Sequence, residues 1–254
     1  MAWTETRSSS FAVRYEQEDE TDVAELLDQL EGTRERLDEA FGRLPQDIAV
    51  VVHPTATQLA LAQPMLPVVR RMTAPAARRY LAGWYTASEV HVLAPRLLRE
   101  RASNVPGSVE MLLLTPSALY TQLVVGHLHP KLPPPFRPAS LRTYSTWAWL
   151  VAGAGSWFSG QTAWARPAII RRLREGGKPA FPPNVSDAPL LGGTIYDLLV
   201  REEGQGAAVR LARAPLADGP RRVLERAFGE RAAVHTEGTW RSHLTRMATA
   251  AGDR

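Results

Sequence analysis

The 254-residue sequence predicts an α+β fold, in which an N-terminal lobe of mixed helices and strands, residues 1–135, precedes a mainly helical C-terminal lobe, residues 136–254. Two observations support this fold class. Strand-like apolar segments lie before residue 96, whereas apolar residues spaced by three and four continue to the C-terminal region. A hydrophobic content of 44% over this length is enough to form a sizeable core.

The first predicted elements are two strands with a helix between them. Phe11–Tyr15 alternates as a half-buried strand does, and Ile48–Val52 is a continuous apolar run. Between them, apolar residues keep the spacing of one helix face; they are Val23, Leu26, Leu27, Leu30, Leu37 and Phe41. Thr21 with Glu25 favours a start of this helix, and Gly42 favours its end.

A broken helix and a hairpin are predicted next. Gln58–Met72 has a helical pattern that Pro64 and Pro67 are expected to interrupt. Tyr80–Tyr85 and Glu89–Pro95 are apolar segments separated by a short polar stretch, which is typical of a β-hairpin.

The rest of the chain is predicted to be helical. One helix begins near Thr115, which suits a cap, followed by Pro116, and it runs through Val125. The next contains the segment Trp149–Gly155 (WLVAGAG) and continues beyond it. The closing array has helical spacing interrupted by a glycine; its residues are Ile195, Leu198, Leu199, Gly204, Ala208 and Leu211.

The segment Trp149–Gly155 resembles the second signature of the peptidase-MA-like (gluzincin) metallopeptidases, Trp-Leu-x-Glu-Gly-x-Ala, whose Glu is a zinc ligand. The resemblance extends over most of the chain. It implies a zincin-like (thermolysin-like) fold with an edge strand beside the active-site cleft. Such a strand binds the substrate backbone by strand addition, and Trp84–Val92 is the candidate for it.

The resemblance also implies a bound zinc ion, but this sequence lacks the side chains that would bind it. The residues that stand in place of His-Glu-x-x-His have Thr121 and Val125 where the two imidazoles would be, and Gln122 where the general base would be. Ala152 replaces the third ligand. Because none of these side chains can perform the family's role, we expect no catalytic residues of the usual kind and no zinc cofactor.

His127 and His129 are the alternative metal pair. None of the six histidines belongs to a His-Glu-x-x-His motif or its inverse. Pro130 and the proline-rich run after it predict a turn, and no carboxylate is close in sequence. These features favour a structural role for the two histidines over metal ligation.

The sequence therefore favours a catalytically inactive pseudopeptidase that binds a peptide or protein partner in the vacated cleft. The candidate cleft residues are Trp84, Tyr85, Trp149, Trp157 and Tyr196. Tyr196 has an alternative interpretation as a helical tyrosine packed at a wet edge. The binding hypothesis would fail if the cleft were filled by the chain's own side chains, and that outcome would favour a purely structural role.

Two other function classes remain open. The first is a hydrolase, metal-dependent or not, with a non-standard site, although the chain has no Gly-x-Ser-x-Gly, no Ser-x-x-Lys and no cysteine. The second is an arginine-rich nucleic-acid-binding protein, since 28 of the 30 basic residues are arginine and the net charge is +4. The 26 interspersed acidic residues and the lack of a recognition motif count against nucleic-acid binding.

The sequence shows neither the pattern of a signal peptide nor that of a membrane-spanning segment. The N-terminal residues do not contain the apolar core of a signal peptide, and no apolar run approaches the roughly 20 residues that cross a bilayer. We therefore expect a cytoplasmic protein with no membrane partner.

Overall fold

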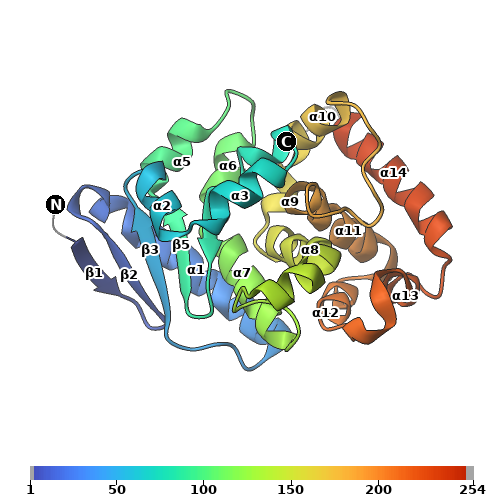
Figure 1. Ribbon diagram of the computed structural model, residues 1–254, viewed down its shortest axis with the longest axis horizontal. Coiled ribbons are helices and arrows are strands. Elements are labelled where there is room, and N and C mark those ends of the chain that lie inside the picture. The colour runs from blue at the N-terminus through green and yellow to red at the C-terminus, as the bar shows by residue number, and fades with distance from the viewer. Residues whose placement is uncertain (1–2, 250–254) are drawn as a thin grey trace.

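The computed structural model describes residues 3–249 and shows an α+β fold, with one five-stranded sheet at the N-terminal side and helices elsewhere (Figure 1). The strands are β1 (Trp3–Arg7), β2 (Phe11–Glu16), β3 (Ile48–His53), β4 (Gly83–Tyr85) and β5 (Glu89–Leu93). The predicted strands and hairpin are confirmed. β1 was not predicted, because Trp3 is its only large apolar side chain and none of its residues is fully buried.

The sheet has the order β1-β2-β3-β5-β4. The three central strands, β2, β3 and β5, run parallel to one another. The two edge strands are antiparallel to their neighbours, β1 to β2 and β4 to β5. β4 therefore forms one edge of the sheet. Its register places Trp84 opposite His91 on β5.

The first helix, α1 (Glu20–Phe41), packs on β2 and on α7. The residues that it buries include all six of the predicted apolar face. Gly42 follows it with a φ of 69°, a conformation that glycine adopts without strain, and this confirms the predicted end.

Short helices connect the strands and lead to the centre of the molecule. They are α2 (Ala56–Ala62), α3 (Met65–Met72), α4 (Pro75–Arg78), α5 (Pro95–Arg101) and α6 (Ser108–Leu113). Pro64 separates α2 from α3 as predicted, but Pro67 does not break α3. It falls in the first turn, where a missing N–H costs no helical hydrogen bond.

Two long helices, α7 (Thr115–Leu128) and α8 (Pro138–Phe158), form the centre of the molecule. α7 contacts α1, β4, β5 and α8, and α8 packs most extensively on α11 (Ala188–Glu203). Because α7 is surrounded on all sides, most of its residues are buried. The direct packing of α7 on α8 spans the predicted lobe boundary at residues 135 and 136, and that division remains a prediction.

The remaining helices are α9 (Gln161–Trp164), α10 (Arg166–Arg174), α12 (Gly206–Ala212), α13 (Gly219–Ala227) and α14 (Ala233–Thr249). They form the helical side of the molecule, with α10 and α14 adjacent (Figure 1). Gly204 directly follows α11 with a φ of 81°, as the sequence pattern predicts.

Candidate functional site

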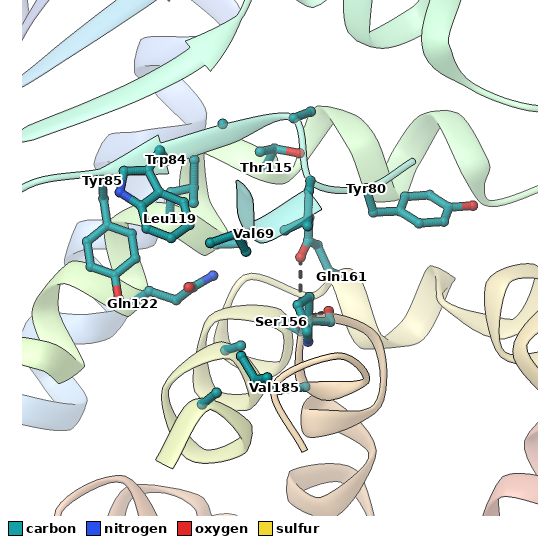
Figure 2. A pocket seen from close by; sticks show the side chains of 18 of the residues that line it. Val69, Tyr80, Trp84, Tyr85, Thr115, Leu119, Gln122, Ser156, Gln161 and Val185 are labelled. Carbon is teal, nitrogen blue, oxygen red and sulfur yellow. Dashed lines mark hydrogen bonds between the residues drawn. The ribbon is translucent and has the colours of Figure 1, made fainter. Parts of the chain in front are cut away.

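A narrow pocket lies where β4, α7 and α8 meet (Figure 2). Its internal volume is about 50 Å³, and its walls are mainly apolar. Residues from all three elements line it, among them Trp84 and Tyr85 from β4, Leu119 and Gln122 from α7, and Ala152 and Ser156 from α8. Val69 from α3 and Val185 from the loop before α11 complete the walls.

The pocket brings together two of the four positions that the family resemblance assigns to zinc chemistry. Gln122 and Ala152 both line it, although they are 30 positions apart in the chain. Thr121 and Val125 lie in the core instead, and the Thr121 hydroxyl donates to the Ser117 carbonyl at 2.8 Å. An amide, a methyl group, an alkyl chain and an occupied hydroxyl do not fit zinc, which binds imidazole, thiolate and carboxylate.

The helices that carry Gln122 and Ala152 pack closely on their neighbours. A Cβ atom at Gly155 of α8 would lie 2.6 Å from the Gln122 Cγ and 2.8 Å from the Ala118 carbonyl oxygen. On the other side of α8, a Cβ atom at Gly153 would lie 2.7 Å from the Gly192 backbone of α11. Glycine thus allows α8 to fit between α7 and α11, so backbone fills the space beneath Gln122.

Two buried hydroxyl groups of the pocket have no hydrogen-bond partner among the described residues. They belong to Tyr85 and Thr115. Figure 2 shows the Tyr85 ring extending toward the side chain of Gln122. Burial raises the pKa of Tyr85 well above its ordinary value, so its hydroxyl remains protonated and can donate. An unpaired buried hydroxyl costs about 1–3 kcal/mol, which a bound polar atom would recover.

Thr115 corrects one prediction. The helix cap is Leu114, and Thr115 is the first helical residue, so its hydroxyl makes no capping bond. The side chain faces the pocket instead.

The free edge of β4 carries backbone groups beside this pocket. Leu93 N–H donates to the Ala82 carbonyl and Thr86 N–H donates to the Glu89 carbonyl, so residues 82, 84 and 86 face β5. Antiparallel pairing alternates, and Gly83 and Tyr85 therefore direct their N–H and C=O groups outward. Among the described residues no hydrogen bond reaches these outward groups. Arg70 occupies the next outward group, the Leu81 carbonyl.

The chain's own side chains cover most of this edge. All three β4 residues are buried, with Trp84 only 6% exposed. Phe136, from the segment between α7 and α8, packs on Trp84 with ring centroids 4.8 Å apart and on Tyr85 at 5.2 Å. Tyr144 of α8 packs on Phe136. The cleft is therefore largely filled, and the space left for a ligand is the narrow pocket.

Of the five predicted cleft residues, Trp84 and Tyr85 line the pocket, whereas Trp149, Trp157 and Tyr196 pack between helices. The Trp149 ring is buried 6.1 Å from that of Trp147. Trp157 lies 6.5 Å from Tyr196, whose hydroxyl donates to the Leu150 carbonyl at 3.0 Å. Tyr196 is fully buried, so the wet-edge interpretation does not describe it.

The predicted histidine pair is held by backbone atoms. The His127 Nδ1 lies 2.9 Å from the Leu123 carbonyl oxygen, and the His129 Nε2 lies 2.7 Å from that of Ala212. Each of these nitrogens donates to its carbonyl, which leaves the His127 Nε2 and the His129 Nδ1 as the acceptors of the two rings. Within residues 3–249, no group of three or more His, Cys, Asp or Glu side chains is arranged to hold a metal ion.

A different histidine pair, which was not predicted from the sequence, lies in the sheet. His53 Nε2 on β3 lies 3.1 Å from His91 Nδ1 on β5, and His91 Nε2 lies 3.2 Å from a Glu89 carboxylate oxygen. Burial is the main cause that lowers the pKa of both imidazoles. The register of two parallel strands creates this pair, and that register is not visible in either segment alone.

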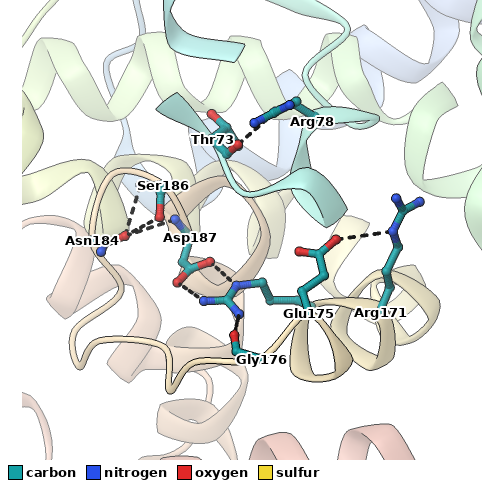
Figure 3. A network of polar contacts seen from close by, with 9 residues as sticks. Thr73, Arg78, Arg171, Glu175, Gly176, Asn184, Ser186 and Asp187 are labelled. Carbon is teal, nitrogen blue, oxygen red and sulfur yellow. Dashed lines mark hydrogen bonds and ion pairs between the residues drawn. The ribbon is translucent and has the colours of Figure 1, made fainter. Parts of the chain in front are cut away.

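The arginines that are adjacent in sequence are mostly engaged within the protein. Arg70 and Arg78 donate to backbone carbonyls. Arg172 pairs with buried Asp187, and Arg221 and Arg222 pair with Glu225. Figure 3 shows the dashed contacts of the Asp187 carboxylate. These contacts fix the guanidinium groups at separate places.

Comparison of the chain with protein-family models, with curated proteins and with solved structures found no match. None of the helices within residues 3–249 is both long enough and apolar enough to cross a membrane.

Proposed function

We propose that this protein is a catalytically inactive, peptidase-MA-like protein that binds a short peptide segment of a partner along β4. The observation that carries the proposal is the meeting of unpaired outward backbone groups on Gly83 and Tyr85 with a pocket that contains two unpaired hydroxyls. The partner segment would have to displace the Phe136 segment that covers this edge. It would then pair with the backbone groups as an added strand and place one side chain in the pocket.

The side chains at the pocket support binding without hydrolysis. Gln122 is a neutral amide where a peptidase of this family would have a carboxylate base, and Ala152 presents a methyl group. Neither can act as the general base toward water or supply a carboxylate ligand to zinc. A peptide held on β4 would therefore remain intact.

The pocket limits the side chain that it can accept. A water molecule needs roughly 10–15 Å³ of such volume, so a pocket of this size takes only a few heavy atoms. Its apolar walls suit a methyl group, and the hydroxyls of Tyr85 and Thr115 suit a polar atom. Threonine or serine fits both demands, which makes a segment with a small hydroxylated side chain the preferred ligand.

The test is selection of peptides from a random library on the full-length protein, followed by fluorescence polarisation with the synthesised peptides. Val185→Trp would narrow the pocket from a half-buried loop position. It should weaken binding by about tenfold or more, which corresponds to about 1.4 kcal/mol. Ser145→Phe adds an aromatic ring on an exposed part of α8 and should leave affinity unchanged.

A second measurement uses the wild-type protein and so does not depend on the folding of a variant. Peptides methylated in turn at each backbone nitrogen should lose affinity at alternate positions, because strand pairing uses every second amide. Uniform tolerance of methylation, or failure of the library to yield any binder, would contradict the proposal. Either result would favour a purely structural role, which the burial of all three β4 residues also suits.

A further inference from the structure

A second and larger depression lies on the surface between α4, α10 and the loop that follows α5. Its volume is about 540 Å³, which is within the range of small-molecule sites. Residues from all three segments line it, including Arg79 at the end of α4, Val105 in the loop, and Ile170, Arg171, Arg174 and Glu175 on or next to α10. We call it the α4–α10 groove.

Positive charge predominates in the α4–α10 groove. Three arginines line it, Arg79, Arg171 and Arg174, against one carboxylate, Glu175. That carboxylate is bound at 3.4 Å by Arg171, which Figure 3 shows pointing away from the Asp187 network. Among the described residues, no carboxylate lies within 4.0 Å of the Arg79 or Arg174 guanidinium groups. Two cationic side chains are thus left for a ligand.

The backbone holds part of this charge in place. Arg79 Nη1 donates to the Arg101 carbonyl at 2.7 Å, and Arg101 donates in return to the Arg79 carbonyl. The proximity of Arg79 contributes to lowering the pKa of Arg101, after burial as the main cause. Arg101 does not line the groove, but its charge adds to the positive potential beside Arg79.

Part of the groove lining is apolar. Val105 is 50% exposed, and Pro167 and Ile170 of α10 also line the space. A purely inorganic anion would leave these surfaces unused. The combination suits a molecule with an anionic end and an apolar body.

We propose that the α4–α10 groove binds a small phosphate monoester with an apolar or aromatic body. Its phosphate would be held by Arg79 and Arg174, because the planar guanidinium group donates two parallel hydrogen bonds to phosphate oxygens. Its body would lie against Val105 and Ile170. This groove shares only Tyr80 with the lining of the β4 pocket, and the inference does not depend on the proposed peptide binding.

The experiment measures the binding of phenyl phosphate, inorganic phosphate and phenol to the full-length protein by titration calorimetry and saturation-transfer NMR. Phenyl phosphate should bind more tightly than either fragment, and added salt should weaken its binding. Arg174→Glu should reduce its affinity by about tenfold or more, given the strength of hydrogen bonds between charged groups. Arg210→Glu makes the same charge change at an exposed position on distant α12 and should have no effect.

Circular dichroism establishes that both variants are folded, and Arg174→Ala provides a milder loss of the same contact. Equal affinity of phenyl phosphate for wild type and the Arg174 variants would overturn the proposal. So would binding of inorganic phosphate as tight as that of phenyl phosphate, which would leave the apolar wall without a role. A single-stranded oligonucleotide that binds while phenyl phosphate does not would assign the surface to a nucleic acid instead.

Discussion

The guanidinium group of Arg172 on α10 donates two hydrogen bonds to the carboxylate of Asp187, at 2.5 and 2.9 Å. Both side chains are largely buried, and Arg172 also donates to the Gly176 carbonyl. Asp187 directly precedes α11, so this pair ties α10 to the start of α11 and fixes the loop that carries Val185 to the β4 pocket.

Removal of this pair should destabilise the protein strongly. Arg172→Ala leaves the Asp187 carboxylate buried and unpaired, which costs about 3–5 kcal/mol. Chemical denaturation would measure the change. Arg171→Ala is the matched control, because its exposed pair with Glu175 contributes only about 0–1 kcal/mol. Similar losses of unfolding free energy in the two variants would show that the Arg172–Asp187 pair contributes no more than an exposed pair.

The close packing of α8 on α11 should not tolerate a methyl group. Gly153→Ala places a Cβ atom 2.7 Å from Gly192 backbone atoms, and overpacking of this kind costs about 1–3 kcal/mol. Gly238→Ala on exposed α14 meets no atom within 4 Å and should stabilise by up to about 1 kcal/mol through helix propensity. The melting temperature should fall for Gly153→Ala and rise for Gly238→Ala. A shift of both melting temperatures in the same direction would refute the packing argument.

The hydroxyl of Thr115 is expected to serve binding at the expense of stability. Thr115→Val removes an unpaired buried hydroxyl and should be neutral or stabilising by about 1–2 kcal/mol. The same change should lower the affinity of the protein for the peptides selected on the β4 pocket. Thr194→Val is the control, because that hydroxyl accepts from Trp240 Nε1 at 2.8 Å, and its loss should lower stability. A destabilised Thr115→Val protein would mean that the hydroxyl has a partner.

Acid should destabilise the protein partly through His53. Burial, with a contribution from His91, lowers the pKa of His53 from 6.5 to about 4. The folded chain therefore binds this proton more weakly than the unfolded chain. The stability that neutral His53 contributes is full above pH 6.5 and is lost as the pH falls from 6.5 toward 4, by up to about 3 kcal/mol.

The difference between wild type and His53→Gln isolates this contribution, because Glu89 and other carboxylates titrate in both proteins. Unfolding free energies measured from pH 7.5 to 4 should fall more steeply for wild type than for His53→Gln. His235→Gln, at an exposed position on α14, should follow the wild-type curve. Parallel curves for wild type and His53→Gln would exclude the His53 contribution.

Zinc should not be a stoichiometric component of the protein. Protein purified without chelator or affinity tag and dialysed against a low zinc concentration should contain less than one equivalent by mass spectrometry of the metal, and chelation should leave its melting temperature unchanged. We expect this result because the side chains of Thr121, Gln122, Val125 and Ala152 are not zinc ligands. One bound equivalent would contradict it and direct attention to His127 and His129, and to His53 and His91.

Most of the secondary structure was predictable because its signals are local. The apolar spacing from Val23 to Phe41 marks α1, and the segments around β4 and β5 mark the hairpin. β1 escaped prediction because its side chains are mainly polar, and the position of Thr115 was misassigned because a residue suited to a cap can also be the first helical residue.

The site was predictable only in part. Proximity of Gln122 to Ala152 was expected from the family resemblance, and the fold places both at one pocket. Helical spacing shows that two residues can share a face, but it does not show which helix covers that face. Trp149, Trp157 and Tyr196 therefore were candidates for a cleft, whereas they pack between helices, and the segment carrying Phe136 covers the edge strand.

The shortness of β4 also bears on aggregation. An exposed sheet edge can recruit the edge of another molecule and grow into an extended assembly. Here β4 is three residues long, Arg70 occupies the carbonyl before it, and the opposite edge strand, β1, carries the charged side chains of Glu5 and Arg7. These features should keep the sheet from polymerising with copies of itself, and they leave the proposed partner segment only a short edge to pair with.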